Sequence, residues 1–164
     1  MPLPKILVSA CLLGANVRYD GRNNRLDNTF LQHLVDEGLV VSVCPEVLGG
    51  LPTPRPYAEI VQRFPIQIIA TDKRDVTDEY VTGAELTLEL AQKHGCVAAL
   101  MKAGSPSCGN HSIQGGSFSG KTVAGAGVAA QELIHKGIPV FNEEQIERLE
   151  SLLAQSSSDL NISA

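Results

Sequence analysis

The sequence contains no tryptophan, few other aromatic residues and no long run of apolar residues. A membrane-spanning helix needs about 20 consecutive apolar residues, so we expect no association with a membrane. Lys and Arg do not cluster, and the net charge is −5, which argues against the positive surface that a nucleic-acid polymer requires. The scarcity of aromatic side chains also removes the usual stacking platforms for long single strands. A single nucleobase is left open as a substrate.

The first eleven residues lack the basic region and the cleavage site of a signal peptide, so we expect a cytoplasmic protein. In that reducing compartment cysteines are better suited to metal binding or catalysis than to disulfides. The sequence has four of them, Cys11, Cys44, Cys96 and Cys108. Any one of these cysteines, taken alone, equally fits the role of a small buried apolar residue.

A helical stretch that ends in glycine and is followed at once by an apolar strand recurs along the chain. The three cases are Gly38 before 39–43, Gly95 before 96–100 and Gly137 before 138–141. A glycine supplies the left-handed conformation that closes a helix. These strands, like 6–8, are nearly continuous apolar runs, which is typical of a parallel sheet covered by helices on both faces. We predict a three-layer, doubly wound (Rossmann-like) α/β fold with about five mainly parallel strands, in which 66–69 is a weaker strand at an edge.

Length and composition suit one domain. We expect residues 1–150 to form a single catalytic domain and residues 151–164, where serines and polar residues accumulate, to be a frayed or disordered tail. Asp27 or Asn28 is expected to cap a helix, and Thr77 to cap the next one. The sequence does not specify whether the protein is a monomer or a homodimer.

Three of the cysteines occupy equivalent places in this predicted fold. Cys11, Cys44 and Cys108 each follow the carboxyl end of a strand, where ligands bind in open parallel sheets, whereas Cys96 begins a strand at the opposite edge. Glycine, proline and serine surround each of the three, and four of the nine prolines lie in the stretch 45–56. Such rigid loops usually shape a site. We therefore expect the three thiols to converge and Cys96 to be structural.

Two metal sites fit three converging thiolates. A 4Fe–4S cluster normally takes four cysteines, so three would leave one iron with an open position. A structural zinc needs a fourth protein ligand, and His111 stands three residues after Cys108. The spacing alone does not decide between a cluster and a zinc ion.

Several long segments resemble one bacterial family, formerly of unknown function, whose characterised members are thiouracil desulfidases. The clearest are Val-Cys-Pro-Glu-Val-Leu-Gly-Gly-Leu-Pro-Thr-Pro-Arg-Pro at 43–56 and Ser-Pro-Ser-Cys-Gly at 105–109. The others are 5–14, 17–21, 75–77, 83–84 and 118–120. The resemblance covers roughly residues 5–150. It implies a 4Fe–4S cluster held by three cysteines, which match Cys11, Cys44 and Cys108. It also implies hydrolysis of a thiolated uracil, a small molecule whose sulfur binds the open iron, without redox chemistry.

The resemblance extends to catalytic groups. The family's acidic residue after the second cysteine matches Glu46, and the first serine of its Ser-Pro-Ser-Cys motif matches Ser105. A carboxylate beside the cluster could activate water or move a proton. The alternative role for Glu46 is that of an acid in the first turn of a helix. Arg55 and Ser9 are expected to bind the substrate. A non-catalytic module that binds metal or senses redox state, using Cys11, Cys44, Cys108 and His111, is the alternative function.

Residues 115–122 match the phosphate-binding pattern G-x-x-x-x-G-K-T letter for letter. Such a loop must follow a strand directly, whereas here a Gly/Ser-rich stretch separates the motif from the preceding strand. We expect a loop that covers the cluster pocket, and a nucleotidase is the least favoured alternative.

Overall fold

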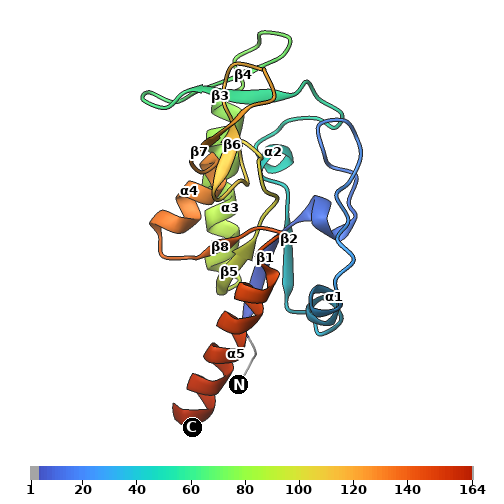
Figure 1. Ribbon diagram of the computed structural model, residues 1–164, viewed down its shortest axis with the longest axis vertical. Coiled ribbons are helices and arrows are strands. Elements are labelled where there is room, and N and C mark those ends of the chain that lie inside the picture. The colour runs from blue at the N-terminus through green and yellow to red at the C-terminus, as the bar shows by residue number, and fades with distance from the viewer. Residues whose placement is uncertain (1–3, 164) are drawn as a thin grey trace.

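The computed structural model describes residues 4–163, with the backbone alone from residue 156 onwards, and has a parallel sheet at its centre (Figure 1). In chain order the elements are β1 (Lys5–Ser9), the 3-10 helix η1 (Ala10–Leu13), α1 (Thr29–Asp36), β2 (Val40–Val43), α2 (Pro45–Leu48), β3 (Ala58–Gln62), β4 (Gln67–Ala70), α3 (Thr77–Lys93), β5 (Cys96–Leu100), β6 (Ser112–Gln114), β7 (Thr122–Ala124), α4 (Val128–His135), β8 (Val140–Phe141) and α5 (Ile146–Ser163).

The central sheet has four parallel strands in the order β2-β1-β5-β8. The predicted α/β class and parallel sheet are confirmed, with four central strands where about five were expected. The prediction of an edge strand at 66–69 is wrong, because β4 pairs antiparallel with β3 in a separate hairpin. In β4 buried residues alternate with more exposed ones, the pattern of a hairpin with one covered face.

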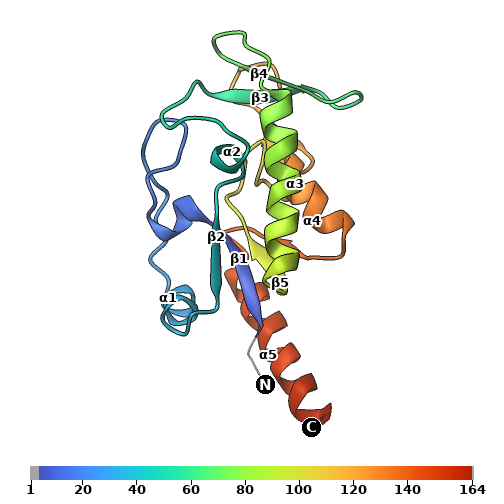
Figure 2. The same cartoon turned by 180° about the vertical axis from the view of Figure 1, so that it is seen from behind.

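Helices cover both faces of the sheet. Leu7 and Ala99 face the layer of α3 and α4, in which Leu133 is fully buried. Ile6 and Leu100 face the opposite layer, formed by α1 and α5. Neighbouring residues of a strand point to opposite faces, so the unbroken apolar runs serve both layers. Figure 1 shows α5 in front of the sheet, and Figure 2 shows α3 in front of it from behind.

The two hairpins lie beyond the carboxyl ends of the central strands, whereas α5 extends from the other end of the molecule (Figure 1). Ile60 of β3, Ile113 of β6 and Tyr80 of α3 share a third apolar cluster that joins the hairpins to the body. The segment expected to be a frayed tail continues α5 as far as Ser163, and residue 164 lies outside the described residues. None of the helices over residues 4–163 is both long and apolar enough to cross a membrane.

One of the two predicted helix caps is confirmed. Asn28 precedes α1 and its Oδ1 accepts a hydrogen bond of 3.0 Å from the backbone N–H of Leu31. The prediction for Thr77 is wrong, because Thr77 is the first residue inside α3. Its hydroxyl accepts a bond from Ile68 N–H, and its own N–H donates to Asp75. A strand that comes near in space has therefore taken the hydroxyl that would otherwise cap the helix.

Candidate active site

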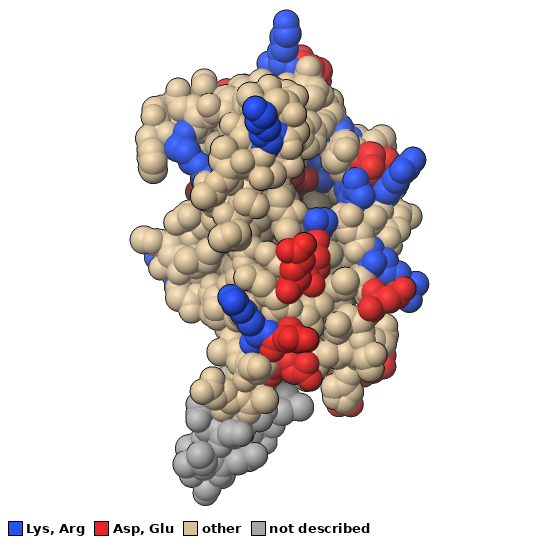
Figure 3. Space-filling model, viewed as in Figure 1, with Lys and Arg blue, Asp and Glu red and all other residues tan. Residues whose placement is uncertain are grey.

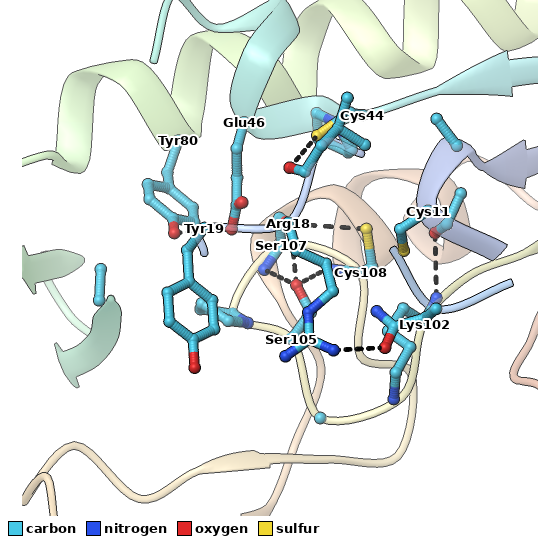
Figure 4. A pocket seen from close by; sticks show the side chains of 18 of the residues that line it. Cys11, Arg18, Tyr19, Cys44, Glu46, Tyr80, Lys102, Ser105, Ser107 and Cys108 are labelled. Atoms are coloured by element: carbon cyan, nitrogen blue, oxygen red, sulfur yellow. Dashed lines mark hydrogen bonds between the residues drawn. The ribbon is translucent and has the colours of Figure 1, made fainter. Parts of the chain in front are cut away.

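A cavity of about 410 Å³ lies at the carboxyl ends of β1 and β2, where the order of the sheet places β1 between β2 and β5. Cys11, Cys44 and Cys108 all line it, and Figure 4 shows their sulfur atoms directed toward one space. Cys96 begins β5, at the other end of the sheet, and is buried. The structure thus brings together the three cysteines that sequence reasoning grouped and separates the fourth from them.

Each of the three cysteines sits in a sharply turned backbone. Cys11 lies in η1, which Gly14 closes with a left-handed φ of 96°. Cys44 directly precedes α2, whose first residue is a proline. Cys108 is 5% exposed in the loop after β5. Burial is the largest influence on all three thiols; it raises the pKa of Cys11 and Cys44 and raises that of Cys108 to about 12.

The thiols do not surround a single point. Within residues 4–163 no three His, Cys, Asp or Glu side chains are grouped closely enough to hold one metal ion. A zinc ion needs its sulfur ligands about 2.3 Å from one centre, whereas each thiolate of an iron–sulfur cluster binds a separate iron. His111 is exposed and contributes nothing to the cavity wall. The arrangement favours a cluster over a zinc site built from three cysteines and His111.

Glu46 projects from α2 into the same cavity, and its carboxylate is held on both oxygens. Tyr80 of α3 donates its hydroxyl to Oε1 at 2.7 Å. Arg55 donates Nε–H to Oε2 at 3.1 Å and also contacts that oxygen through Nη2. Figure 4 shows Glu46 and Tyr80 side by side at the cavity wall.

Arg55 has no N–H left over. Besides the two donors to Glu46, Nη2 donates to Val17 O at 2.8 Å, and Nη1 donates to Pro52 O and to Thr53 Oγ1, both at 3.1 Å. A guanidinium has five N–H groups, so all are used within the protein. The side chain is 3% exposed, and Arg55 therefore serves as a strut between α2 and the surrounding loops.

The two predicted serines also line the cavity. Ser9, at the end of β1, accepts a bond from Lys102 N–H at 3.0 Å and donates to Met101 Sδ at 3.6 Å. Ser105 accepts the backbone N–H groups of Ser107 and Cys108, both at 3.1 Å, and so fixes the turn that carries Cys108.

Sequence reasoning did not single out Ser107, which is 2% exposed. Its hydroxyl lies 3.0 Å from that of Ser105 and donates to the sulfur of Cys108 at 3.5 Å. Its place beside a cysteine in the Ser-Pro-Ser-Cys motif was the available signal. Hydrogen bonds to ligating sulfurs tune iron–sulfur clusters, so Ser107 belongs to the surroundings of the site.

Lys102, Tyr57 and Tyr80 are further lining residues that sequence reasoning did not assign to the site. Lys102 forms an ion pair of 2.7 Å with Glu143. Burial raises the pKa of Glu143, but the hydrogen bond and charge of Lys102 outweigh it, and the pKa lies below its usual value. Lys102 follows the carboxyl end of β5, a signal that could have identified it. On the face shown in Figure 3, basic side chains are interspersed with acidic ones.

The segment that matches a phosphate-binding loop has another role. Residues 115–122 connect β6 to β7 in an antiparallel hairpin, and a strand rather than a helix follows them. Glu59 of β3 is 2% exposed, and its Oε1 accepts the N–H groups of Gly116 at 2.7 Å and Phe118 at 3.2 Å. A buried carboxylate thus occupies amides that a phosphate would need. The nucleotidase alternative fails for this reason.

Comparison with known proteins agrees with this geometry. The model of a family described as 2-thiouracil desulfurase matches residues 6–145. The uncharacterized protein YbbK of Bacillus subtilis (strain 168) is 40% identical over 148 residues, which cover 86% of this chain and 97% of YbbK. The solved structure of the 4Fe–4S-dependent thiouracil desulfidase TudS superposes with a TM-score of 0.89 at 45% identity, covering 93% of this chain and 99% of that one. This chain belongs to the 2-thiouracil desulfurase family.

Proposed function

We propose that this protein is an iron–sulfur-dependent desulfidase that removes sulfur from a thiolated uracil by hydrolysis. The observation that carries the proposal is the convergence of Cys11, Cys44 and Cys108 on one cavity at the carboxyl edge of a parallel sheet. The cavity, at about 410 Å³, is within the range of small-molecule sites, about 300–1,000 Å³. The family and the likeness to TudS support the same substrate class.

The donor set fits a 4Fe–4S cluster with three cysteine ligands. Thiolates are the ligands that such clusters take, and the fourth cysteine, Cys96, lies at the far end of the sheet. Cys11, Cys44 and Cys108 would hold three irons. When bound, the cluster would supply an open iron as a Lewis acid for the substrate sulfur, which polarises the C=S bond.

The chain's own residues supply the proton chemistry. Water attacks the thiocarbonyl carbon, a C–O bond forms, the C–S bond breaks, and sulfur leaves as sulfide, so no oxidant or reductant is consumed. Glu46 is placed to take the proton from the attacking water and to return it to the departing sulfur. The Ser105 hydroxyl, at the cavity wall, is proposed to hydrogen-bond the substrate or the intermediate formed at its carbon.

Arg55 and Ser9 were expected to bind the substrate. Because every N–H of Arg55 is engaged, we propose that it acts on the reaction through Glu46. Ser9 donates its only hydroxyl hydrogen to Met101, and we propose that it offers the substrate no more than a wall.

The test is anaerobic reconstitution followed by iron, sulfide and uracil analysis with 2- and 4-thiouracil. We expect about four irons per chain and one sulfide released per uracil formed. Glu46→Ala is expected to keep the iron and lose at least about 100-fold in kcat, the usual contribution of general acid–base catalysis. Zinc in place of iron, or an iron-loaded protein that releases no sulfide, would refute the proposal in favour of a sensing module. Normal turnover by Glu46→Ala would remove that residue from the mechanism.

A further inference from the structure

The carboxylate of Glu46 is gripped by groups from two separate parts of the chain. Tyr80 reaches it from α3, and Arg55 reaches it from the proline-rich loop after α2. Both partners are inaccessible, since Tyr80 is 4% exposed and the Arg55 side chain 3%. The two donors approach different oxygens, so the plane of the carboxylate is fixed as well as its position.

We propose that Tyr80 is a positioning residue for catalysis, which together with Arg55 orients the Glu46 carboxylate toward the reacting carbon. The inference rests on the proposed function, because it assigns Tyr80 a role through Glu46. A glutamate side chain has three rotatable bonds, and on a four-residue helix little else restrains it. Small errors in the placement of a catalytic group cost much of its effect, so the two donors determine how useful the carboxylate is.

The bland role for Tyr80 is that of a core residue. Its ring does pack in the cluster of Ile68, Val76 and Ile113. A phenylalanine would fill that space equally well, so the ring does not explain the hydroxyl. A buried tyrosine O–H needs a partner, and this one uses Glu46 at the cavity wall. Burial and the neighbouring carboxylate both raise the pKa of Tyr80, so it remains a donor at any ordinary pH.

The backbone around this contact leaves no freedom for drift. Gly83 lies one helical turn after Tyr80, and the carbonyl of Pro45, the residue before Glu46, is so close that an added Cβ at Gly83 would overlap its oxygen. Gly49, at the other end of α2, is equally close to the carbonyl of Glu79. The contact of α2 with α3 therefore sets where Tyr80 meets Glu46.

The test compares Tyr80→Phe with the control Thr87→Val in anaerobically reconstituted protein. Thr87 is on the same helix, is fully buried and donates its hydroxyl to Gly83 O at 2.6 Å, away from the cavity wall. Both changes thus delete one buried hydroxyl of α3. We expect Tyr80→Phe to retain its iron, to lose about tenfold in kcat (about 1.4 kcal/mol) and to keep KM within about twofold, while Thr87→Val keeps both constants.

The decisive comparison is the same change in a Glu46→Gln background. A residue that acts only through the Glu46 carboxylate has nothing left to orient there, so Tyr80→Phe is expected to cause no further loss of kcat. An unchanged kcat in the single Tyr80→Phe variant would overturn the proposal. So would a tenfold loss that persists in the Glu46→Gln background, since it would show an effect independent of Glu46.

A second readout needs no turnover and separates this inference from the proposed function. The melting temperatures of the loaded wild type, the two single variants and the double variant form a thermodynamic cycle. We expect Tyr80→Phe to lower the melting temperature less in the Glu46→Gln background than in the wild type. Equal lowering in both backgrounds would refute the contact itself. Absence of sulfide release by the wild type, in contrast, would refute the desulfidase proposal.

Discussion

Replacing Gly83 by alanine should destabilise the protein, although helix propensity alone predicts the opposite. Gly83 is in the interior of α3, where alanine is favoured over glycine by about 1 kcal/mol. In this structure a Cβ at Gly83 would lie 2.9 Å from the carbonyl carbon of Pro45 and would overlap its oxygen. Contact with a carbonyl carbon is ordinary only from 3.4 Å outwards, so α2 would have to move away.

The magnitude follows from these two opposing effects. Overpacking of a well-filled interface costs typically about 1–3 kcal/mol, and a rigid carbonyl is at the upper end because no side chain can rotate away. Subtracting about 1 kcal/mol for propensity leaves a net loss of about 1–2 kcal/mol in the free energy of unfolding. For a chain of this size each kcal/mol lowers the melting temperature by about 2–4 °C. We therefore expect a decrease of about 2–8 °C.

Differential scanning calorimetry of Gly83→Ala, with Thr82→Ala as the control, measures this directly. Thr82 is the preceding, exposed residue of the same helix, where alanine should be neutral or slightly stabilising. We also expect Gly83→Ala to retain less iron, because α2 carries Cys44 at its start. A melting temperature above that of the wild type would show that α2 and α3 do not approach as closely as argued here.

Three further changes test the rest of the site. Cys108→Ala should lose most of its iron and all desulfidase activity, whereas Cys96→Ala should retain both, as measured by iron analysis and sulfide release; an iron-replete, active Cys108→Ala would refute the ligand assignment. Glu59→Ala leaves two loop N–H groups without their acceptor and should reduce the free energy of unfolding in urea by about 1–3 kcal/mol. Lys121→Ala changes an exposed residue of the hairpin loop and should leave stability within about 0.5 kcal/mol, with no magnesium-dependent ATP hydrolysis to lose.

Local patterns in the sequence predicted the central layer of the fold well. Apolar runs after Gly38, Gly95 and Gly137 correspond to β2, β5 and β8, because a strand buried on both faces can contain few polar residues. The same reasoning failed for β4, whose apolar residues pack against another hairpin strand. Short strands of that kind depend on a partner that no local pattern specifies.

Predictions for the site divide in a similar way. The cysteines and Glu46 could be named because they follow strand ends or match family motifs. The groups that hold Glu46 could not, because Tyr80 occupies a helical stripe that looks like core and its hydroxyl is explained only by a partner 34 positions earlier in the chain. Arg55 was found but given a substrate-binding role, since a free guanidinium and a fully engaged one look alike in sequence.

The phosphate-loop match shows most clearly why a motif needs its surroundings. The glycines at 115–122 do expose backbone N–H groups, which is the property that makes such loops bind anions. Here the anion is internal: Glu59, on a strand far away in sequence, fills the position from beneath. The same chemistry that would hold a phosphate instead fastens a hairpin beside Tyr57, a residue of the cavity wall whose ring is 6.3 Å from that of Phe118 in the hairpin loop. A polar motif therefore identifies a capacity for binding, and only the fold determines whether a ligand or the protein itself uses it.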